Sequence, residues 1–521
     1  MSESSRFRGL REGLPVVSSA AVVAVMLLAL LGMVGIMLIK GMTHFWPSQI
    51  YELKYDQHGQ QNTLFATLLS EDFTIVRGQS RWLFNQASLY QFSDQQHLIE
   101  ERSIVSLQPL PALADIQLRN GNRLFAELQS IVNGDEEIAE PEIAQVRHLV
   151  EQKVLKLQTL ESGRLATIHL RLNELNLRGV EEDAPAKLRL QEEFTKTMSD
   201  IGALQQELAR YRMVLRFANG ERYELPLAQV EEYYQPNQFD FWQELGWCLG
   251  AMWDFVSEKP KRANSAGGVF PALFGTVVMV LMMTLLVTPL GVMAAIYLNE
   301  YAPDNWLTSF IRVGVNNLAG VPSIVYGVFG LGFLVYQVGG SIDALFFSEH
   351  LPAPTFGAPG IFWASVTMAM LTLPVVIVAT EEGLRRVPNS LRQGSYALGA
   401  TKYETLWRTV IPMASPGIMT GVILAIARGA GEVAPLLLVG AVKFAPSLPI
   451  DGEFPFLHLD RQFMHLGVLI YDGAFHSNNI GHGSSMMFAS CLLLLLVVLL
   501  LNISAIWVRA RLRRLYQNLL R

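Results

Sequence analysis

Six long apolar stretches divide the chain into segments expected in a membrane and segments expected in water. The first stretch, residues 14–39, contains no charged residue and exceeds the roughly 20 residues that a helix needs to cross a bilayer. It is also longer than the core of a signal peptide, which predicts an uncleaved anchor. The other stretches cover residues 269–298, 313–336, 360–380, 414–442 and 484–508. The pattern predicts an all-α polytopic membrane protein with six transmembrane helices.

Residues 46–255 follow a different pattern, with short strand-like runs and long polar helices. Asn-Gly pairs within residues 116–128 and 214–227 predict two β-hairpins. Residues 142–177 and 185–212 are rich in Leu, Glu, Gln, Lys and Arg at helical spacing, which predicts an antiparallel helical hairpin. Coiled-coil dimerisation is the less favoured alternative. We therefore expect a large α+β insertion between the first two transmembrane helices.

An aromatic stretch closes this insertion at residues 239–255. It carries three tryptophans, Trp242, Trp247 and Trp253, and aromatic rings favour the headgroup layer of a bilayer. The stretch is predicted either as an interfacial helix or as a helix of the domain core, with equal weight.

Positive charge predicts the orientation of the chain. Arginines and lysines are concentrated in residues 383–412 and in the tail 509–521, and such residues favour the cytoplasmic side. With six spans, the N-terminal residues 1–13, the loop 383–412 and the basic tail are then cytoplasmic, and residues 46–255 are periplasmic. The basic cluster at residues 259–262 disagrees, but it follows a long translocated domain, and such domains cross largely regardless of charge.

Composition supports the membrane assignment and excludes some functions. Hydrophobic residues make up 51% of the chain and charged residues 17%, and the net charge of −6 gives no indication of nucleic-acid binding. Two cysteines provide no disulfide framework or metal site. The sequence has no Gly-x-x-x-x-Gly-Lys-Ser/Thr pattern, so we expect no enzymatic ATP hydrolysis by this chain and no cofactor in it.

The loop between the fourth and fifth apolar stretches contains start and stop signals for two short helices. Pro388 suits the first turn of a helix, and Gly399 can adopt the positive φ that ends it. Thr401 and Glu404 have the spacing of a capping box for a second helix, which Pro412 is expected to close. These signals predict a compact two-helix unit or, with equal weight on this pattern alone, an ordinary amphipathic loop at the membrane surface.

Arg428 and Glu432 are the only charged residues within the six apolar stretches. A charge there costs about 2.5–3.5 kcal/mol on insertion scales, and it usually faces a partner or a cavity. Their i, i+4 spacing predicts that they lie on one helix face and can pair. One interpretation is a purely structural ion pair; the other is that Arg428 helps an anion pass, because a guanidinium matches phosphate oxygens.

Neighbouring residues add to the functional interpretation. The same stretch contains residues that can bend or break a transport helix: Pro416, Gly421 and Pro435. Asn316 and Asn317, in the third apolar stretch, are weaker candidates for the substrate path, since they can also bond across helices.

The loop resembles the signature loop of binding-protein-dependent ABC-transporter permeases. Gly399 and Pro412 keep the spacing of that family, whereas residues 393–395 read Gln-Gly-Ser where Glu-Ala-Ala is expected. Four further runs resemble the phosphate-specific permeases of the A type: residues 299–303, 320–332, 373–388 and 427–437. The C-type permeases are similar in the loop, but the Glu-x-Ala-Pro-Leu-Leu sequence from Glu432 favours the A type.

This resemblance implies a permease subunit of an ATP-driven phosphate importer in the bacterial inner membrane, with an ABC importer permease core at residues 267–508. The implied partners are a C-type permease subunit, a homodimeric ABC ATPase that binds ATP and Mg²⁺, and a periplasmic phosphate-binding protein. Residues 388–412 would couple to the ATPase through Ser395, Leu398, Gly399, Ala400, Thr401, Glu404 and Pro412. The alternatives are a membrane receptor or sensor on the same scaffold and a permease for another oxyanion.

Overall fold

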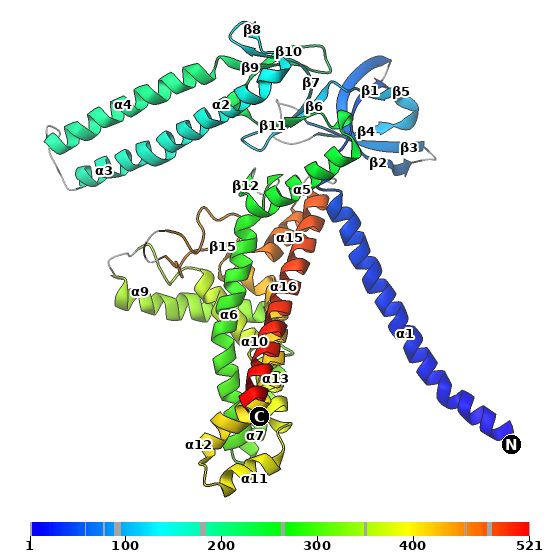
Figure 1. Cartoon of the computed structure of the whole chain (residues 1–521), viewed down its shortest axis with the longest axis vertical. Helices are drawn as coiled ribbons and strands as arrows, with labels where there is room; N and C mark the ends of the chain where they lie inside the picture. The colour runs from blue at the N-terminus through cyan, green and yellow to red at the C-terminus, as the bar shows by residue number, and fades with distance from the viewer. Residues whose placement is uncertain are drawn as a thin grey trace. The chain divides into compact units, whose positions relative to one another are not determined.

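The computed structural model describes residues 3–57, 59–76, 79–87, 95–177, 184–261, 266–348, 352–452, 454, 456–476 and 482–519. The chain forms two compact units (Figure 1). Met1–Phe45 and Ala251–Arg521 form the membrane unit, and Trp46–Gly250 forms the insertion unit. The insertion unit thus ends a few residues before the predicted boundary at 255.

Among the described residues, six helices are long and apolar enough to cross a membrane, as predicted. They are Ser18–Met42 in α1 (Glu3–Met42), Phe270–Tyr301 in α6 (Phe270–Ile296) and its π-helical end η6 (Tyr297–Tyr301), Ser323–Phe346 in α8 (Ser323–Phe329), η7 (Gly330–Gly339) and α9 (Gly340–Phe346), Ile361–Arg385 as α10, Lys402–Gly431 in α12 (Lys402–Thr405), η9 (Leu406–Val410) and α13 (Ile411–Gly431), and Ser485–Arg511 in α16 (His482–Leu519).

Helix α10 lies at the centre of the membrane unit, where it packs against α6 and α13. In the most apolar 18-residue segment of α10, 67% of the residues are buried, whereas in that of α1 none is buried. Small residues bring α10 and α13 close together: a Cβ on Gly417 would lie 2.5 Å from the Cα of Gly383. Close backbone approach at small residues is the usual way in which membrane helices associate, since lipid supplies no hydrophobic drive between them.

The third span begins later than predicted. Val313 and the residues up to Leu318 belong to a separate amphipathic helix, α7 (Trp306–Leu318), and the spanning helix starts at Ser323. Pro322 at the N-cap of α8 explains the break, because proline lacks the N–H that a continuous helix needs and restricts the residue before it. Asn316 and Asn317 therefore lie in α7 and outside the span, contrary to the prediction.

The predicted span 414–442 is also interrupted. α13 ends at Gly431, Glu432 is extended (φ −80°, ψ 134°), and a short helix α14 (Ala434–Val439) follows with Pro435 in its first turn. Glu432 thus lies just outside the helix whose face it was expected to share.

At the other end of α13, Pro412 does not close the preceding helix as expected. It lies in the first turn of α13, directly after the π-helical turn η9. A wider turn before a proline accommodates its missing N–H and its ring, so α12, η9 and α13 continue as one helix.

In the described part of the insertion unit, the strands form two antiparallel sheets, in the orders β4-β3-β2-β1-β5 and β10-β9-β7-β6-β11, with β8 beside β7. The strands of the first sheet are β1 (Ile50–Gln57), β2 (Gln60–Val76), β3 (Gln79–Gln86), β4 (Gln95–Glu100) and β5 (Ile104–Pro109). Those of the second are β6 (Leu113–Leu118), β7 (Arg123–Asn133), β8 (Glu136–Glu137), β9 (Tyr211–Arg216), β10 (Arg222–Pro226) and β11 (Val230–Tyr234).

Both predicted hairpins are confirmed. β6 pairs with β7 and β9 with β10, and each turn contains a glycine with positive φ, Gly121 at 84° and Gly220 at 83°. Asn-Gly turns are favoured here because glycine adopts this conformation without steric cost.

The helical hairpin is also confirmed as an intramolecular, antiparallel pair (Figure 1). Its first arm consists of α2 (Glu140–Gln158), η2 (Thr159–Leu165) and α3 (Ala166–Leu177), and its second arm is α4 (Pro185–Leu208). An ion pair of 3.0 Å between Arg164 and Glu193 joins the arms. α4 ends before the predicted residue 212 because the chain from Tyr211 pairs as β9.

The aromatic stretch forms α5 (Phe241–Ser257). Trp242 and Trp253 are exposed, whereas Trp247 packs against Tyr234 with ring centroids 4.0 Å apart. Two exposed tryptophans favour the interfacial interpretation of this helix. The described residues also include β12 (Pro260–Lys261) with β13 (Ala266–Gly267), β14 (Ala441–Val442) with β15 (Phe463–Met464), and α15 (Leu466–Phe475).

Candidate functional site

Arg428 and Glu432 meet at the interruption between α13 and α14. Arg428 lies in the last turn of α13, and its Nε is 3.6 Å from Oε1 of Glu432. The two side chains are 35% and 24% exposed, so both remain accessible despite their position in a membrane-spanning region. The predicted pairing is therefore present, but one partner comes from a helix end and the other from extended backbone.

Tight packing fixes the backbone on both sides of this pair. A Cβ on Gly429 would lie 2.5 Å from Sδ of Met283 in α6, so a larger residue there would require this methionine side chain to move. On the other side, a Cβ on Gly327 in α8 would lie 2.7 Å from Cα of Pro435. α6 and α8 thus hold the interruption in place. Irregular backbone at membrane depth is tolerated where it is buried in protein or lines a cavity, and interrupted helices of this kind form solute sites in transporters.

The coupling segment, residues 388–412, has the two predicted helices and the predicted capping box, but Pro388 and Pro412 do not take their predicted positions. α11 (Asn389–Ala397) is followed by Gly399 with a φ of 86°, and a capping box starts α12. In that box the N–H of Thr401 donates to Oε2 of Glu404 at 2.9 Å. Pro388 lies at the N-cap of α11, one position before the helix.

The residues predicted to contact an ATPase differ in their surroundings. Leu398 is 91% exposed, and the nearby Tyr403 and Trp407 are also exposed, so the segment presents apolar side chains to its surroundings. Ser395, in contrast, shares a hydrogen bond of 2.9 Å with Thr405 and holds α11 against α12. Ala400 continues this contact, because its N–H donates to the Ser395 carbonyl at 3.2 Å. An exposed apolar surface on a rigid two-helix unit suits protein docking.

Asn316 lines a polar cavity of about 190 Å³ between α7 and α10. The charged side chains in its lining are Arg312, Glu381, Glu382 and Arg385, and Arg428 and Glu432 are not part of it. The two kinds of candidate path residue therefore do not form a single site.

Sequence reasoning missed several of these charges. Oε1 of Glu381 lies 3.9 Å from Nε of Arg312, and its Oε2 lies 3.7 Å from Nη2 of Arg385. In a separate ion pair, Oε1 of Glu300 lies 2.9 Å from Nη1 of Arg392. The spacing of Glu381 and Arg385 on a helix that continues past residue 380 was the available signal. The pairs from distant segments had no such signal, because they depend on how α7 packs on α10 and how α11 packs on the end of α6.

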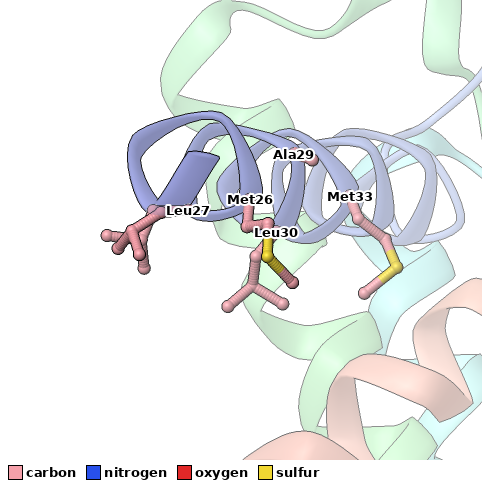
Figure 2. A pocket seen from close by; sticks show the side chains of 6 residues that line it. Met26, Leu27, Ala29, Leu30 and Met33 are labelled. Atoms are coloured by element: carbon pink, nitrogen blue, oxygen red, sulfur yellow. The ribbon is translucent and has the colours of Figure 1, made fainter. Parts of the chain in front are cut away.

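An apolar hollow on α1 carries no comparable chemistry. Figure 2 shows Leu27, Leu30 and Met33 along α1 where they line this hollow. The other lining residues are Val23, Met26 and Ala29. Leucine and methionine side chains of this kind suit contact with lipid tails or other apolar helices.

Comparison with known proteins identifies the class. Residues 287–515 match the family described as binding-protein-dependent transport system inner membrane component. The chain is 34% identical over 252 residues to the phosphate transport system permease protein PstA of Yersinia pestis, which covers 48% of this chain and 75% of that protein. It is 36% identical over 249 residues to PstA of Mycobacterium leprae, which covers 47% of this chain and 69% of that protein.

Among solved structures, the chain is similar to the inward-facing MetNI methionine ABC transporter, with 19% identity and a TM-score of 0.36 over 46% of this chain and 94% of that chain. Family membership rests on the sequence relatives. The chain belongs to the binding-protein-dependent transport permeases of the inner membrane, and within them to the group of the PstA phosphate permeases. The insertion unit precedes the matched residues 287–515.

Proposed function

We propose that this chain is the A-type permease subunit of an ATP-driven importer of inorganic phosphate and that Arg428 contacts the passing anion. The observation that carries the proposal is the accessible Arg428–Glu432 pair at an interrupted transmembrane helix, in a chain whose relatives are phosphate permeases. A guanidinium offers a planar fork of donors that matches phosphate oxygens. Glu432 balances the charge of Arg428 when no anion is present, which lowers the cost of keeping the arginine in the membrane.

The continuity of α12, η9 and α13 supplies the mechanical connection. A partner ATPase would dock on the exposed apolar residues of the coupling segment. ATP and Mg²⁺ would bind to that ATPase and not to this chain. Because α12 runs into α13 without a loop, a displacement of the coupling segment moves the helix that carries Arg428. Such a movement is how ATP binding would alternate access to the anion site.

The distribution of positive charge supports the topology that we propose. Residues 1–13, the coupling segment and the tail 509–521 are cytoplasmic, and the insertion unit is periplasmic. The second permease subunit is a C-type partner, and a periplasmic phosphate-binding protein delivers the substrate. The insertion unit is available to dock that protein or another envelope partner.

Uptake of labelled phosphate tests the proposal. A strain that lacks its own copy of this subunit, but expresses the other importer subunits, should recover uptake when this chain is supplied. Excess sulfate should not compete with the label. No recovery with the chain present in the membrane would instead favour a receptor, and competition by sulfate would favour a general oxyanion permease.

A further inference from the structure

A largely buried ion pair connects the coupling segment to a transmembrane helix that is not adjacent to it in the chain. Nη1 of Arg392 in α11 lies 2.9 Å from Oε1 of Glu300 in η6, the end of α6. The Glu300 side chain is only 7% exposed and that of Arg392 is 18% exposed. The amide of Asn299 also donates to the same Glu300 oxygen, at 2.9 Å.

The same residue is attached to the second helix of the coupling segment. Nζ of Lys402, at the start of α12, donates to the backbone carbonyl of Glu300. The ammonium group also lies 4.6 Å from the centre of the Tyr301 ring, within the range of a cation–π contact. Residues 300 and 301 thus contact both α11 and α12.

Arg392 extends the connection to a third helix. Its Nη2 donates to the carbonyl of Leu384 in the last turn of α10 at 2.8 Å. Beneath these polar contacts, a buried apolar cluster joins the ends of the same elements; it contains Ala295, Leu298, Ile377, Leu384, Val387, Leu406, Val410 and Ala414. The ends of α6 and α10 and the start of α13 therefore form one packed joint around Glu300.

We infer that Glu300 is a positioning residue that makes α6 follow the coupling segment during transport. The covalent chain already joins the segment to α10 and α13, and the Glu300–Arg392 pair adds α6. Separating the pair would leave a nearly buried carboxylate without its charged partner, which is unfavourable, so the pair stays closed while the segment moves. This inference rests on the proposed function, because it assigns a role in coupling ATP hydrolysis to phosphate movement.

The test uses the whole importer in proteoliposomes, with both permease subunits, the ATPase and the binding protein. The quantity measured is the amount of labelled phosphate transported per ATP hydrolysed. For Glu300→Gln we expect an importer with a lower thermal midpoint, because Arg392 loses its charged partner, that still assembles and hydrolyses ATP. The ratio should fall by about tenfold, within the usual range of coupling between sites. A residue needed only for folding would lower assembly and hydrolysis together and leave the ratio unchanged.

The double variant Glu300→Gln/Arg392→Gln should show the same ratio as Glu300→Gln alone, because the two residues act as one unit. The matched control is Glu382→Gln, whose ion pair with Arg386 is exposed, with side chains 64% and 80% accessible. It should couple normally, since exposed ion pairs contribute little.

An unchanged ratio in Glu300→Gln, or an equal fall in Glu382→Gln, would overturn the inference. If Glu300→Gln does not assemble, Arg392→Lys replaces it, because lysine keeps the charge but cannot hold Glu300 and the Leu384 carbonyl together. A smaller fall in the ratio is then expected, and an unchanged ratio again overturns the role. Phosphate transport by the parent complex tests the proposed function separately: its absence refutes that function, whereas normal coupling by Glu300→Gln refutes only this inference.

Discussion

The close approach of α10 and α13 should not tolerate a single added methyl group at Gly417. A Cβ there would lie 2.5 Å from Cα of Gly383 and 3.1 Å from its nitrogen. Carbon atoms in favourable contact are about 3.5–4.0 Å apart, so the helices would have to separate by roughly 1 Å. The obstacle is backbone on both sides, and no side chain can rotate out of the way.

Overpacking of this kind costs about 1–3 kcal/mol, which corresponds to a roughly 5- to 150-fold change in an equilibrium constant. For Gly417→Ala we therefore expect a clear fall in the thermal midpoint of the detergent-purified importer, measured by the loss of its size-exclusion peak. Uptake of phosphate should also fall, because α13 carries Arg428 and its position against α10 would change.

The matched control is Gly332→Ala in the third span, where a Cβ would meet no described atom within 4 Å. That variant should be as stable as the parent protein or slightly more stable, since alanine is less flexible than glycine. If Gly417→Ala and Gly332→Ala have the same thermal midpoint, the packing of α10 against α13 is not as close as described.

Three further outcomes are expected. Gly399→Glu should abolish uptake and co-purification with the ATPase while membrane insertion persists, because the residue has a φ of 86° and lies between α11 and α12. Normal co-purification would contradict the proposed docking surface. Replacing residues 46–250 by a short linker should leave a membrane unit that still assembles in detergent, and loss of the complex would make the insertion part of the assembly core. Asp115→Asn should destabilise β6 and β7 by about 3 kcal/mol, because Asp115 is buried, pairs with Arg123 and accepts a hydrogen bond of 2.7 Å from Tyr234. Burial also raises the pKa of Tyr234, so its hydroxyl stays protonated and able to donate. Unchanged hydrogen exchange in these strands would contradict this prediction.

Features encoded by a few neighbouring residues could be predicted from the sequence. The hairpin turns at Gly121 and Gly220, the positive φ of Gly399 and the capping box of Thr401 and Glu404 all appear as expected. Each depends on local backbone preferences, which a short stretch of sequence contains in full.

Features that depend on tertiary packing could not be predicted in this way. The extended backbone at Glu432 is held by contacts of the flanking residues with α6 and α8, and Pro412 is accommodated by a wider turn that precedes it. The Glu300–Arg392 pair joins residues that are far apart in the chain. Hydrophobic periodicity identifies membrane spans well, but it does not indicate where a span is interrupted or which charges meet.

The most direct test of the central claim compares phosphate transport by the parent importer with that by the double variant Arg428→Gln/Glu432→Gln in proteoliposomes. Removing both charges avoids the cost of leaving one unpaired, so the double variant should fold and assemble normally. If Arg428 contacts the anion, this variant should transport almost no phosphate, and Arg428→Lys, which keeps the charge but not the planar fork, should transport a reduced amount. Near-normal transport by the double variant would contradict the account and leave Arg428 and Glu432 as a structural pair.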